Sequence, residues 1–298
     1  MEASKVFFII NKYSGKAFQS SIEGRIIDAC ANLKLECTIE YTQHKGHATE
    51  LAHAAVTDGF PRVFVMGGDG TVNEVAQALV HTPVAMGILP KGSGNGLARH
   101  LQIPLKTPLA LKLLDASKII EMDTLMVNDK LSVNVSGIGF DAHVASKFGT
   151  NGKRGLMGYA NLVMKEFRGF KEFEFRSTIG GEQSERKSFI IALANSSQFG
   201  NNARVAPLAS VCDGEMEVCF IKKVPLVQAL GFTAKMFTGK IAKSSFVEMI
   251  KTTHFVAEFS TPVAYHIDGE SHAPISKIEV RIQPRSLKMI VPEKARKF

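Results

Sequence analysis

The stretch Gly67–Asn73, Gly-Gly-Asp-Gly-Thr-Val-Asn, follows the apolar run Val63–Met66, which is typical of a buried strand. A segment with helical spacing of its apolar residues comes directly after it. A glycine-rich turn between a strand and a helix lets backbone N–H groups converge on an anion. The stretch therefore predicts a phosphate-binding turn at the carboxyl end of a strand.

A second glycine turn repeats this arrangement. Pro90–Asn95, Pro-Lys-Gly-Ser-Gly-Asn, follows the apolar run Ala85–Leu89. The Ser93 hydroxyl can donate to a phosphate oxygen or a ribose hydroxyl, and Lys91 can screen phosphate charge. Two such turns on neighbouring strands predict a polyphosphate, and hence a nucleotide, at the carboxyl edge of a parallel sheet.

Neither turn fits the two commonest nucleotide motifs. The second turn differs from the pattern G-x-x-x-x-G-K-[ST], which argues against a P-loop. In the first, Gly68-x-Gly70 is followed by Asn73 where the dinucleotide pattern G-x-G-x-x-G needs a glycine. A hydride-transferring Rossmann protein is therefore disfavoured.

Asp69 stands out within the first turn. A carboxylate beside phosphates is repulsive unless a cation lies between them, and Mg²⁺ prefers one or two carboxylates together with phosphate oxygens. The alternative is a turn residue whose side chain bonds its own backbone. Thr71 followed by Glu74 fits a capping box, which predicts a helix that begins at Thr71.

The pattern of expected strands and helices changes along the chain, which predicts two domains. Strands and helices alternate over residues 5–114, which predicts a mostly parallel sheet with helices on both faces. From Ile119 onward, short β-like runs separated by turns indicate an antiparallel sandwich, interrupted by one helix at about residues 156–167. We expect domains at 1–123 and 124–298, and the last residues can return to the first domain.

Composition narrows the class of protein. The net charge of +8 favours an anionic partner, although charge for solubility alone is an equal alternative. There is no Trp and no basic–aromatic interleaving, so no nucleic-acid partner is expected. No apolar stretch reaches the ~20 residues of a spanning helix, and the first residues lack the features of a secretory signal. These observations predict a soluble cytoplasmic protein.

Together, the two glycine turns resemble the diacylglycerol kinase catalytic-domain family, which includes bacterial lipid kinases and sphingoid-base kinases. The similarity extends along the full chain. The resemblance implies an α/β domain like that of NAD kinases and phosphofructokinases, followed by an all-β sandwich that takes the lipid. It also implies ATP-dependent phosphorylation of a lipid hydroxyl with Mg²⁺.

The resemblance carries over to nucleotide contacts. Asn11–Gly15 is similar to the family's Asn-Pro-x-Ser-Gly turn, with Lys12 in place of the usual proline, and Thr42 matches a nucleotide-contacting threonine. The nucleotide-binding residues implied are Asn11, Ser14, Gly15, Thr42, Gly67, Gly68, Asp69, Gly70, Thr71, Val72, Asn73, Gly92, Ser93, Gly94 and Asn95.

Acidic residues near the end of the chain also match. The segment Asp268-Gly269-Glu270 is similar to the family's Asp-Gly-Glu, whose carboxylates are the candidate base for the lipid hydroxyl. Either Asp268 or Glu270 can take the proton, with a slight preference for Asp268. With Asp69 they form the predicted catalytic set. Without the resemblance, a hairpin turn is the simpler interpretation of Asp268-Gly269.

Metal ligands are implied in two places. Asp213-Gly214-Glu215 resembles a structural metal site, with Asp213 binding through its side chain and Ser210 and Glu215 through main-chain oxygens; a plain turn is the alternative. Many bacterial diacylglycerol kinases of the family have Asp where this chain has Gly96. Asp123 is expected to take over part of that task beside Asp69.

Gly96, in place of the family's Asp, also affects what substrate and activity are expected. Gly96 puts diacylglycerol in doubt and favours a sphingoid base or another long-chain alcohol, because sphingoid-base kinases also have a small residue there. Two other functions stay open. One is a kinase for a soluble substrate, of the NAD kinase type. The other is a lipid- or nucleotide-binding homologue that has lost catalysis.

Contact with a membrane is expected from two regions. Residues 226–246 are apolar with interspersed lysines, which resembles an interfacial helix or flap. Lys147, Lys153 and Arg154 form a second basic cluster. The alternative for the first region is a helix packed on the sandwich. We expect transient contact with the inner face of the membrane; a homodimer is compatible with the sequence.

Overall fold

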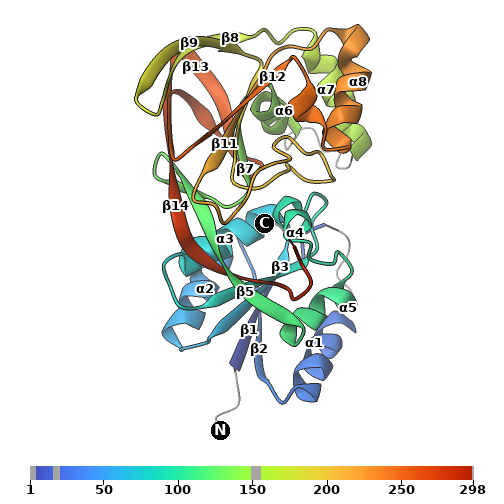
Figure 1. Ribbon diagram of the computed structural model, residues 1–298. Coiled ribbons are helices and arrows are strands. Elements are labelled where there is room, and N and C mark those ends of the chain that lie inside the picture. The colour runs from blue at the N-terminus through green and yellow to red at the C-terminus, as the bar shows by residue number, and fades with distance from the viewer. Residues whose placement is uncertain (1–4, 16–20, 149–155, 297–298) are drawn as a thin grey trace. The chain divides into compact units, whose positions relative to one another are not determined.

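The computed structural model describes residues 5–15, 21–148 and 156–296. It divides the chain into two compact units (Figure 1). Unit 1 comprises Met1–Asp123 and Pro284–Phe298, and unit 2 comprises Thr124–Gln283. Two strands, β5 (Ser117–Val127) and β14 (Glu270–Pro292), run from one unit into the other.

Unit 1 alternates strands and helices along the chain. Its elements are β1 (Lys5–Ile10), α1 (Ser21–Asn32), β2 (Glu36–Tyr41), α2 (His47–Thr57), β3 (Arg62–Gly67), α3 (Asp69–Leu79), β4 (Ala85–Pro90), α4 (Gly96–His100), α5 (Thr107–Ala110) and the 3-10 helix η1 (Leu111–Leu114). The strand order is β14-β4-β3-β1-β2, and every pairing in this part of the sheet is parallel.

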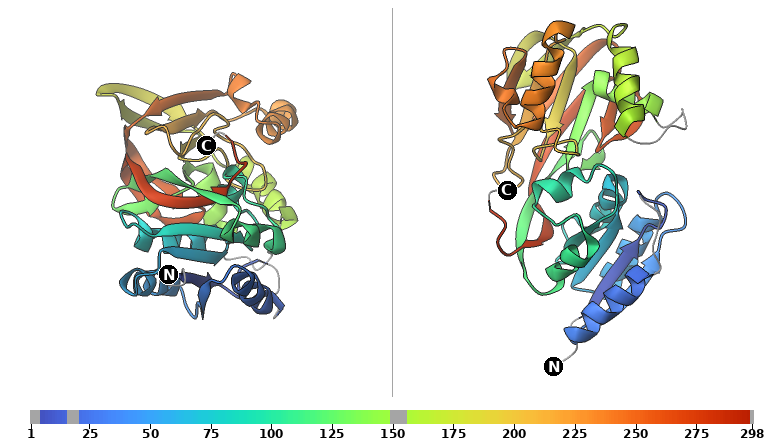
Figure 2. Two further views of the ribbon diagram at one scale, coloured as in Figure 1. Left: turned by 60° about the horizontal axis from the view of Figure 1, so that its bottom comes forward. Right: turned by 90° about the vertical axis from the view of Figure 1, so that its right-hand side faces the viewer.

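Burial explains why this sheet is parallel. All residues of β4 are buried, and β1 and β3 are buried except at their first residues, Lys5 and Arg62. Such continuous apolar strands need cover on both faces, which crossover helices provide. Helix α2 packs on α3 and α1 packs on η1, and helices lie on both sides of the sheet (Figure 2). The predicted α/β architecture is confirmed.

Unit 2 is built mainly from antiparallel strands. Besides β5 and β14 it contains β6 (Lys130–Ser132), β7 (Val135–Gly139), α6 (Phe140–Phe148), α7 (Leu156–Phe167), β8 (Phe173–Ile179), β9 (Glu182–Ser188), β10 (Ile190–Ala194), β11 (Met216–Ile221), α8 (Leu226–Phe237), the 3-10 helix η2 (Ile241–Lys243), β12 (Val247–Thr252) and β13 (His254–Ile267). The order is β12-β11-β10-β7-β13-β14. Off this path, β8 pairs with β13 and β9 with β8, and β5 pairs with β14 and β6 with β5.

Alternating residues of these strands face two different cores. Leu193 and Val218 point into a core that Phe255 shares. On the other face, Cys219 packs in a second core against which Phe232 of α8 lies. The β-sandwich-like domain that was predicted is confirmed, and it carries helices on one face. In the described ranges, no helix has both the length and the hydropathy to span a membrane.

Candidate functional site

The carboxyl ends of the parallel strands of unit 1 meet at one edge. Met66 pairs with Ile10 on one side and with Leu89 on the other. Beyond the last pairs, the Asn11 amide donates to the Met66 carbonyl at 2.8 Å, and the Thr42 amide donates to the Ile10 carbonyl at 3.0 Å. The sheet register therefore brings the segments after β1, β2, β3 and β4 to the same edge.

The two glycine turns are bonded to each other. The amides of Lys91 and Gly92 both donate to the Gly67 carbonyl, at 2.9 and 3.1 Å. A Cβ atom on Gly92 would lie 2.6 Å from the Cα atom of Gly68. Backbone therefore meets backbone at this point, and a side chain on Gly92 would force the turns apart.

Asp69 joins the first turn to the helix that follows the second. Its Oδ2 accepts the Asn95 amide at 3.0 Å, and its Oδ1 accepts the Gly96 amide at 2.8 Å. Asn95 has a left-handed backbone, with φ 51°, and its side-chain amide donates to the Gly92 carbonyl at 2.8 Å. This link differs from both roles expected for Asp69, a magnesium ligand and a bond to the local backbone, and was not predicted.

The predicted start of α3 is wrong. The helix begins two residues before Thr71, with Gly68 as its N-cap. The Thr71 hydroxyl accepts a hydrogen bond from the Asn11 side chain at 3.0 Å. The Glu74 carboxylate accepts the Ala48 amide, at 3.3 Å, in the first turn of α2. Both side chains of the expected capping box therefore serve neighbouring segments.

Lys91 fastens the loop after β1. Its ammonium group donates to the Lys12 carbonyl at 3.0 Å and also to the Ser14 carbonyl. Burial lowers the pKa of Lys91. Gly15 has φ +60°, and a Cβ atom there would lie 1.8 Å from the Lys91 carbonyl oxygen. Three segments thus form one compact layer of backbone at the strand ends.

Exposure divides the predicted nucleotide-binding residues into three groups. Gly15, Gly70 and Ser93 are exposed, and Thr42, Gly67, Thr71, Val72 and Asn95 are buried. The remaining members are partly exposed: Asn11, Ser14, Gly68, Asp69, Asn73, Gly92 and Gly94. We expect the buried residues to support the layer, whereas the exposed and partly exposed ones can contact a ligand.

The two acidic candidates for Mg²⁺ in unit 1 differ in accessibility. Asp69 is partly exposed, and the amides of Asn95 and Gly96 orient its carboxylate, so it fits a magnesium ligand. Asp123 is only 1 % exposed, and its Oδ1 accepts the Arg285 amide at 2.7 Å. That contact attaches β14 where it re-enters unit 1.

The predicted base residues lie in unit 2. Asp268 is 8 % exposed, and its carboxylate accepts the Ser132 hydroxyl at 2.6 Å and the amides of Val133 and Asn134 at 2.8 and 3.1 Å. Glu270, the first residue of β14, is exposed. Asp268 is thus an oriented carboxylate and Glu270 an accessible one.

A buried pair of side chains, which was not predicted from the sequence, supports the Asp268–Glu270 turn. The Gly269 amide donates to His266 Nδ1 at 3.1 Å, so the other ring nitrogen, Nε2, carries the proton. This Nε2 lies 3.1 Å from Asp141 Oδ2, and both side chains are at most 10 % exposed. The pair lies 125 residues apart in sequence, and no local motif signals such a contact.

At the predicted structural metal site, a lysine provides the positive charge. Lys251 Nζ lies 2.5 Å from Asp213 Oδ2, and Asp213 Oδ1 accepts the Glu215 amide at 3.2 Å. The Ser210 hydroxyl accepts the Cys212 amide at 3.3 Å. The hydrogen bond to Asp213 raises the pKa of Lys251. These residues do not fit a metal at Asp213, because the ammonium group takes the cation's place.

We therefore expect chelators to leave the stability of the protein unchanged. Dialysis against EDTA should not lower the Tm measured by differential scanning fluorimetry. Lys251→Gln should lower it by a few degrees, because a partly exposed ion pair contributes up to about 1 kcal/mol. Lys277→Gln, which removes the exposed pair with Glu258, is the control. A Tm that falls with EDTA would show that a metal stabilises the fold and would contradict this expectation.

The Glu217 side chain makes the stability of the folded protein depend on pH. It is 4 % exposed, its Oε2 has no hydrogen-bond partner among the described residues, and burial raises its pKa. A raised pKa means that the folded state holds this proton more tightly than the unfolded state, so stability falls as pH rises through the folded pKa. Glu217→Gln should therefore raise Tm more at pH 8 than at pH 5. An equal change at both values would contradict this.

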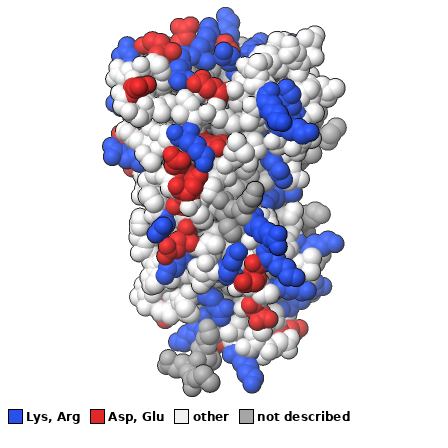
Figure 3. All heavy atoms as spheres, viewed as in Figure 1, with Lys and Arg blue, Asp and Glu red and all other residues white. Residues whose placement is uncertain are grey.

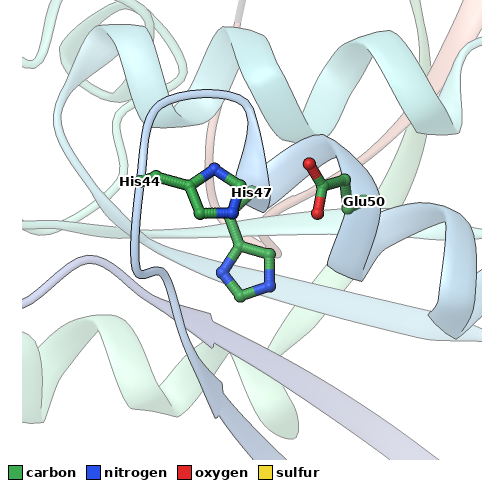
Figure 4. Close-up of side chains that lie close together, drawn as sticks. All are labelled: His44, His47 and Glu50. Atoms are coloured by element: carbon green, nitrogen blue, oxygen red, sulfur yellow. The ribbon is translucent and has the colours of Figure 1, made fainter.

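One group of metal-binding side chain types occurs in the described part of the chain. His44, His47 and Glu50 place ligand atoms within 4.8 Å of one another at the start of α2 (Figure 4). The two rings stack, with centroids 4.7 Å apart and 21° between planes, and His47 Nδ1 accepts the Gln43 amide at 3.0 Å. Because the Gln43 amide takes the lone pair of His47 Nδ1, this ring can offer a metal only its other nitrogen.

Comparison with known proteins agrees with these two units. Residues 5–127 match the model of the diacylglycerol kinase catalytic domain. Residues 134–291 match the YegS C-terminal NAD kinase beta sandwich-like domain. The chain is similar, at a TM-score of 0.76 and 19% identity over 98% of both chains, to a solved structure described as a diacylglycerol kinase from Bacillus anthracis.

Two of the curated relatives described next are named as probable lipid kinases. "Probable lipid kinase YegS-like" of Chromohalobacter salexigens is 28% identical over 83% of this chain and 80% of its own length. "Probable lipid kinase YegS" of Salmonella typhimurium is 28% identical over 87% of each chain. An uncharacterized Synechocystis protein is 28% identical over 79% of this chain, which spans 56% of that relative's length. Because the sandwich model alone matches more than half of the 298 residues, the chain belongs to the YegS-like lipid kinases with a diacylglycerol kinase catalytic domain.

Proposed function

We propose that this protein transfers the γ-phosphate of ATP to a hydroxyl group of a long-chain lipid alcohol. The observation that carries the proposal is the layer of three backbone segments at the strand ends of unit 1, in which Asp69 bonds Asn95 and Gly96. Helix α3 begins directly at this layer with Gly68 as its N-cap. A helix N-terminus beside glycine turns favours phosphate oxygens.

Phosphoryl transfer needs positioning, charge neutralisation and an acceptor for the alcohol proton. The backbone amides of the glycine turns would position the triphosphate. When bound, Mg²⁺ neutralises phosphate charge, and Asp69 would hold it. The lipid oxygen forms a bond to the γ-phosphorus, the bond from this phosphorus to the β–γ bridging oxygen breaks, and ADP leaves. Asp268 or Glu270 takes the alcohol proton.

The substrate class is proposed as diacylglycerol, a sphingoid base or a related alcohol. Gly96, buried at the start of α4, provides no carboxylate beside Asn95. This favours an alcohol other than diacylglycerol, on the resemblance to sphingoid-base kinases. The reaction is proposed to occur at the inner face of the membrane, where ATP and the lipid meet.

The test is a transfer assay with ATP labelled at the γ-phosphate, Mg²⁺ and total extracted lipid. Label in the organic phase, identified as a phosphorylated alcohol by lipid mass spectrometry, is the expected result. Label in the aqueous phase alone, with NAD as acceptor, would favour a kinase for soluble substrates. ATP binding without product over a panel of lipid alcohols would favour an inactive homologue.

A further inference from the structure

Helix α8 turns an apolar side toward solvent. Val227 is 92% exposed and Leu230 is 83% exposed, and Leu226 and Phe237 are each about half exposed. No residue of this helix is buried. At about 100° per residue, Val227, Leu230, Ala234 and Phe237 lie along one stripe. A helix on the surface of a soluble protein ordinarily keeps its apolar stripe for the core.

The opposite side of α8 already faces the core of unit 2. Ala229, Phe232 and Met236 are less exposed than the stripe, and Phe232 packs against the core that contains Cys219. Rotation of the helix would only exchange one apolar side for the other. The exposed stripe is therefore a second apolar surface, and it needs a partner outside unit 2.

Charge around the stripe has one sign. Residues 218–247 contain five lysines and no acidic residue. Lys223 donates to the carbonyls of Arg168 and Phe170, and the other four lysines are exposed: Lys222, Lys235, Lys240 and Lys243. Figure 3 shows basic side chains beside uncharged surface at the upper right, where Figure 1 labels α8.

Nearby acidic side chains do not offset this charge. Glu166 pairs with Lys147 and His143, and Glu248 pairs with Arg186. The Glu172 carboxylate accepts the Lys223 amide at 2.7 Å. Of the lysines around α8, none of the four exposed ones forms an ion pair with any residue that the structure describes.

We propose that α8 docks unit 2 onto a membrane that contains anionic lipids. The stripe of Val227, Leu230, Ala234 and Phe237 enters the boundary between headgroups and acyl chains, and the lysines contact the headgroups. This inference rests on the proposed function in one respect: the proposed lipid substrate lies in a membrane, which the protein must reach. Of the basic cluster predicted from Lys147, Lys153 and Arg154, Lys153 and Arg154 lie outside the described residues.

A second copy of the chain is a weaker occupant for the stripe. A two-fold contact would place the same surface on both sides of the interface. Lys235 and its neighbours would then face a second set of lysines with no carboxylate between them, and such like-charge contact is unfavourable. An anionic lipid surface supplies the missing negative charge.

The test is co-sedimentation of the full chain with vesicles of phosphatidylcholine alone or with phosphatidylglycerol added. Wild type should bind the mixed vesicles, and binding should weaken with salt. Val227→Ser with Leu230→Ser should lower the partition coefficient at least about 10-fold, because two apolar side chains lose their burial. Ile27→Ser with Leu109→Ser removes two exposed apolar side chains from helices of unit 1, and this control should bind like wild type.

The charge is tested separately. Lys235→Gln and Lys240→Gln should each reduce binding to the mixed vesicles about fivefold and should leave binding to phosphatidylcholine unchanged. Lys34→Gln and Lys106→Gln, elsewhere on the chain, serve as controls. Binding of the Val227→Ser, Leu230→Ser variant equal to that of wild type would overturn the proposal. The proposal would also be overturned if wild type formed a dimer in sedimentation velocity experiments and the Val227→Ser, Leu230→Ser variant were the only variant that was monomeric.

Kinase assays distinguish failure of docking from failure of the proposed function. With a short-chain lipid alcohol dissolved as monomers, the Val227→Ser, Leu230→Ser variant should turn over like wild type, and with vesicle substrate it should lose activity in parallel with binding. Vesicle binding by wild type without any phosphorylated lipid would retain the docking surface and reject the kinase. Equal activity of wild type and variant on vesicles would retain the kinase and reject docking.

Discussion

Asp69→Asn should lower kcat/KM at least about 10³-fold, which is ~4 kcal/mol of transition-state stabilisation. The carboxylate accepts two amides, one on each oxygen. A carboxamide keeps one acceptor and turns an NH₂ group toward the other amide, so one of the two hydrogen bonds that Asp69 accepts from Asn95 and Gly96 is lost. The proposed ligand for Mg²⁺ is weakened by the same change.

The measurement is label transfer from ATP to lipid, with circular dichroism and Tm to establish that the variant is folded. Asp58→Asn, at the exposed C-cap of α2, is the matched control and should keep the activity of wild type. Turnover by folded Asp69→Asn within a few-fold of wild type would remove Asp69 from the mechanism.

Gly92→Ala should weaken ATP binding by about 30-fold, equivalent to ~2 kcal/mol, the usual size of an overpacking effect. The new Cβ atom would lie 2.6 Å from Gly68 Cα and 2.9 Å from Asn95 Oδ1. Because Gly68 Cα is backbone and cannot rotate away, the two glycine turns must separate.

Isothermal titration calorimetry with ATP and Mg²⁺ measures this effect directly. The matched control is Gly24→Ala in α1, where an added Cβ atom meets nothing within 4 Å. It should keep the affinity of wild type and gain a little stability from helix propensity. Wild-type affinity in Gly92→Ala would mean that the close approach of the turns has no part in binding the nucleotide.

What the sequence predicts well is encoded locally. The alternation of apolar strands and helical segments, punctuated by glycine turns, specifies a parallel sheet, and parallel strands necessarily end at one edge. The antiparallel unit follows from short strands separated by turns. The interrupting helix lies where it was predicted, at Leu156–Phe167, but a second helix before it, α6 (Phe140–Phe148), was not predicted.

What the sequence leaves open depends on contacts between distant residues. Asp69 bonds Gly96, 27 residues away, and Asp268 bonds Ser132, 136 residues away. Local motifs even mislead at Thr71, because tertiary hydrogen bonds use both members of the expected capping box. At Asp213, the turn motif contains no sign that Lys251 would provide the cation.

The most direct test of the central claim is a crystal structure of the full chain with Mg²⁺ and an ATP analogue that cannot transfer its γ-phosphate. We expect phosphate oxygens on the backbone amides of the Gly67–Gly70 and Gly92–Gly94 turns, at the N-terminus of α3. A nucleotide bound elsewhere, with these amides facing only solvent, would contradict it.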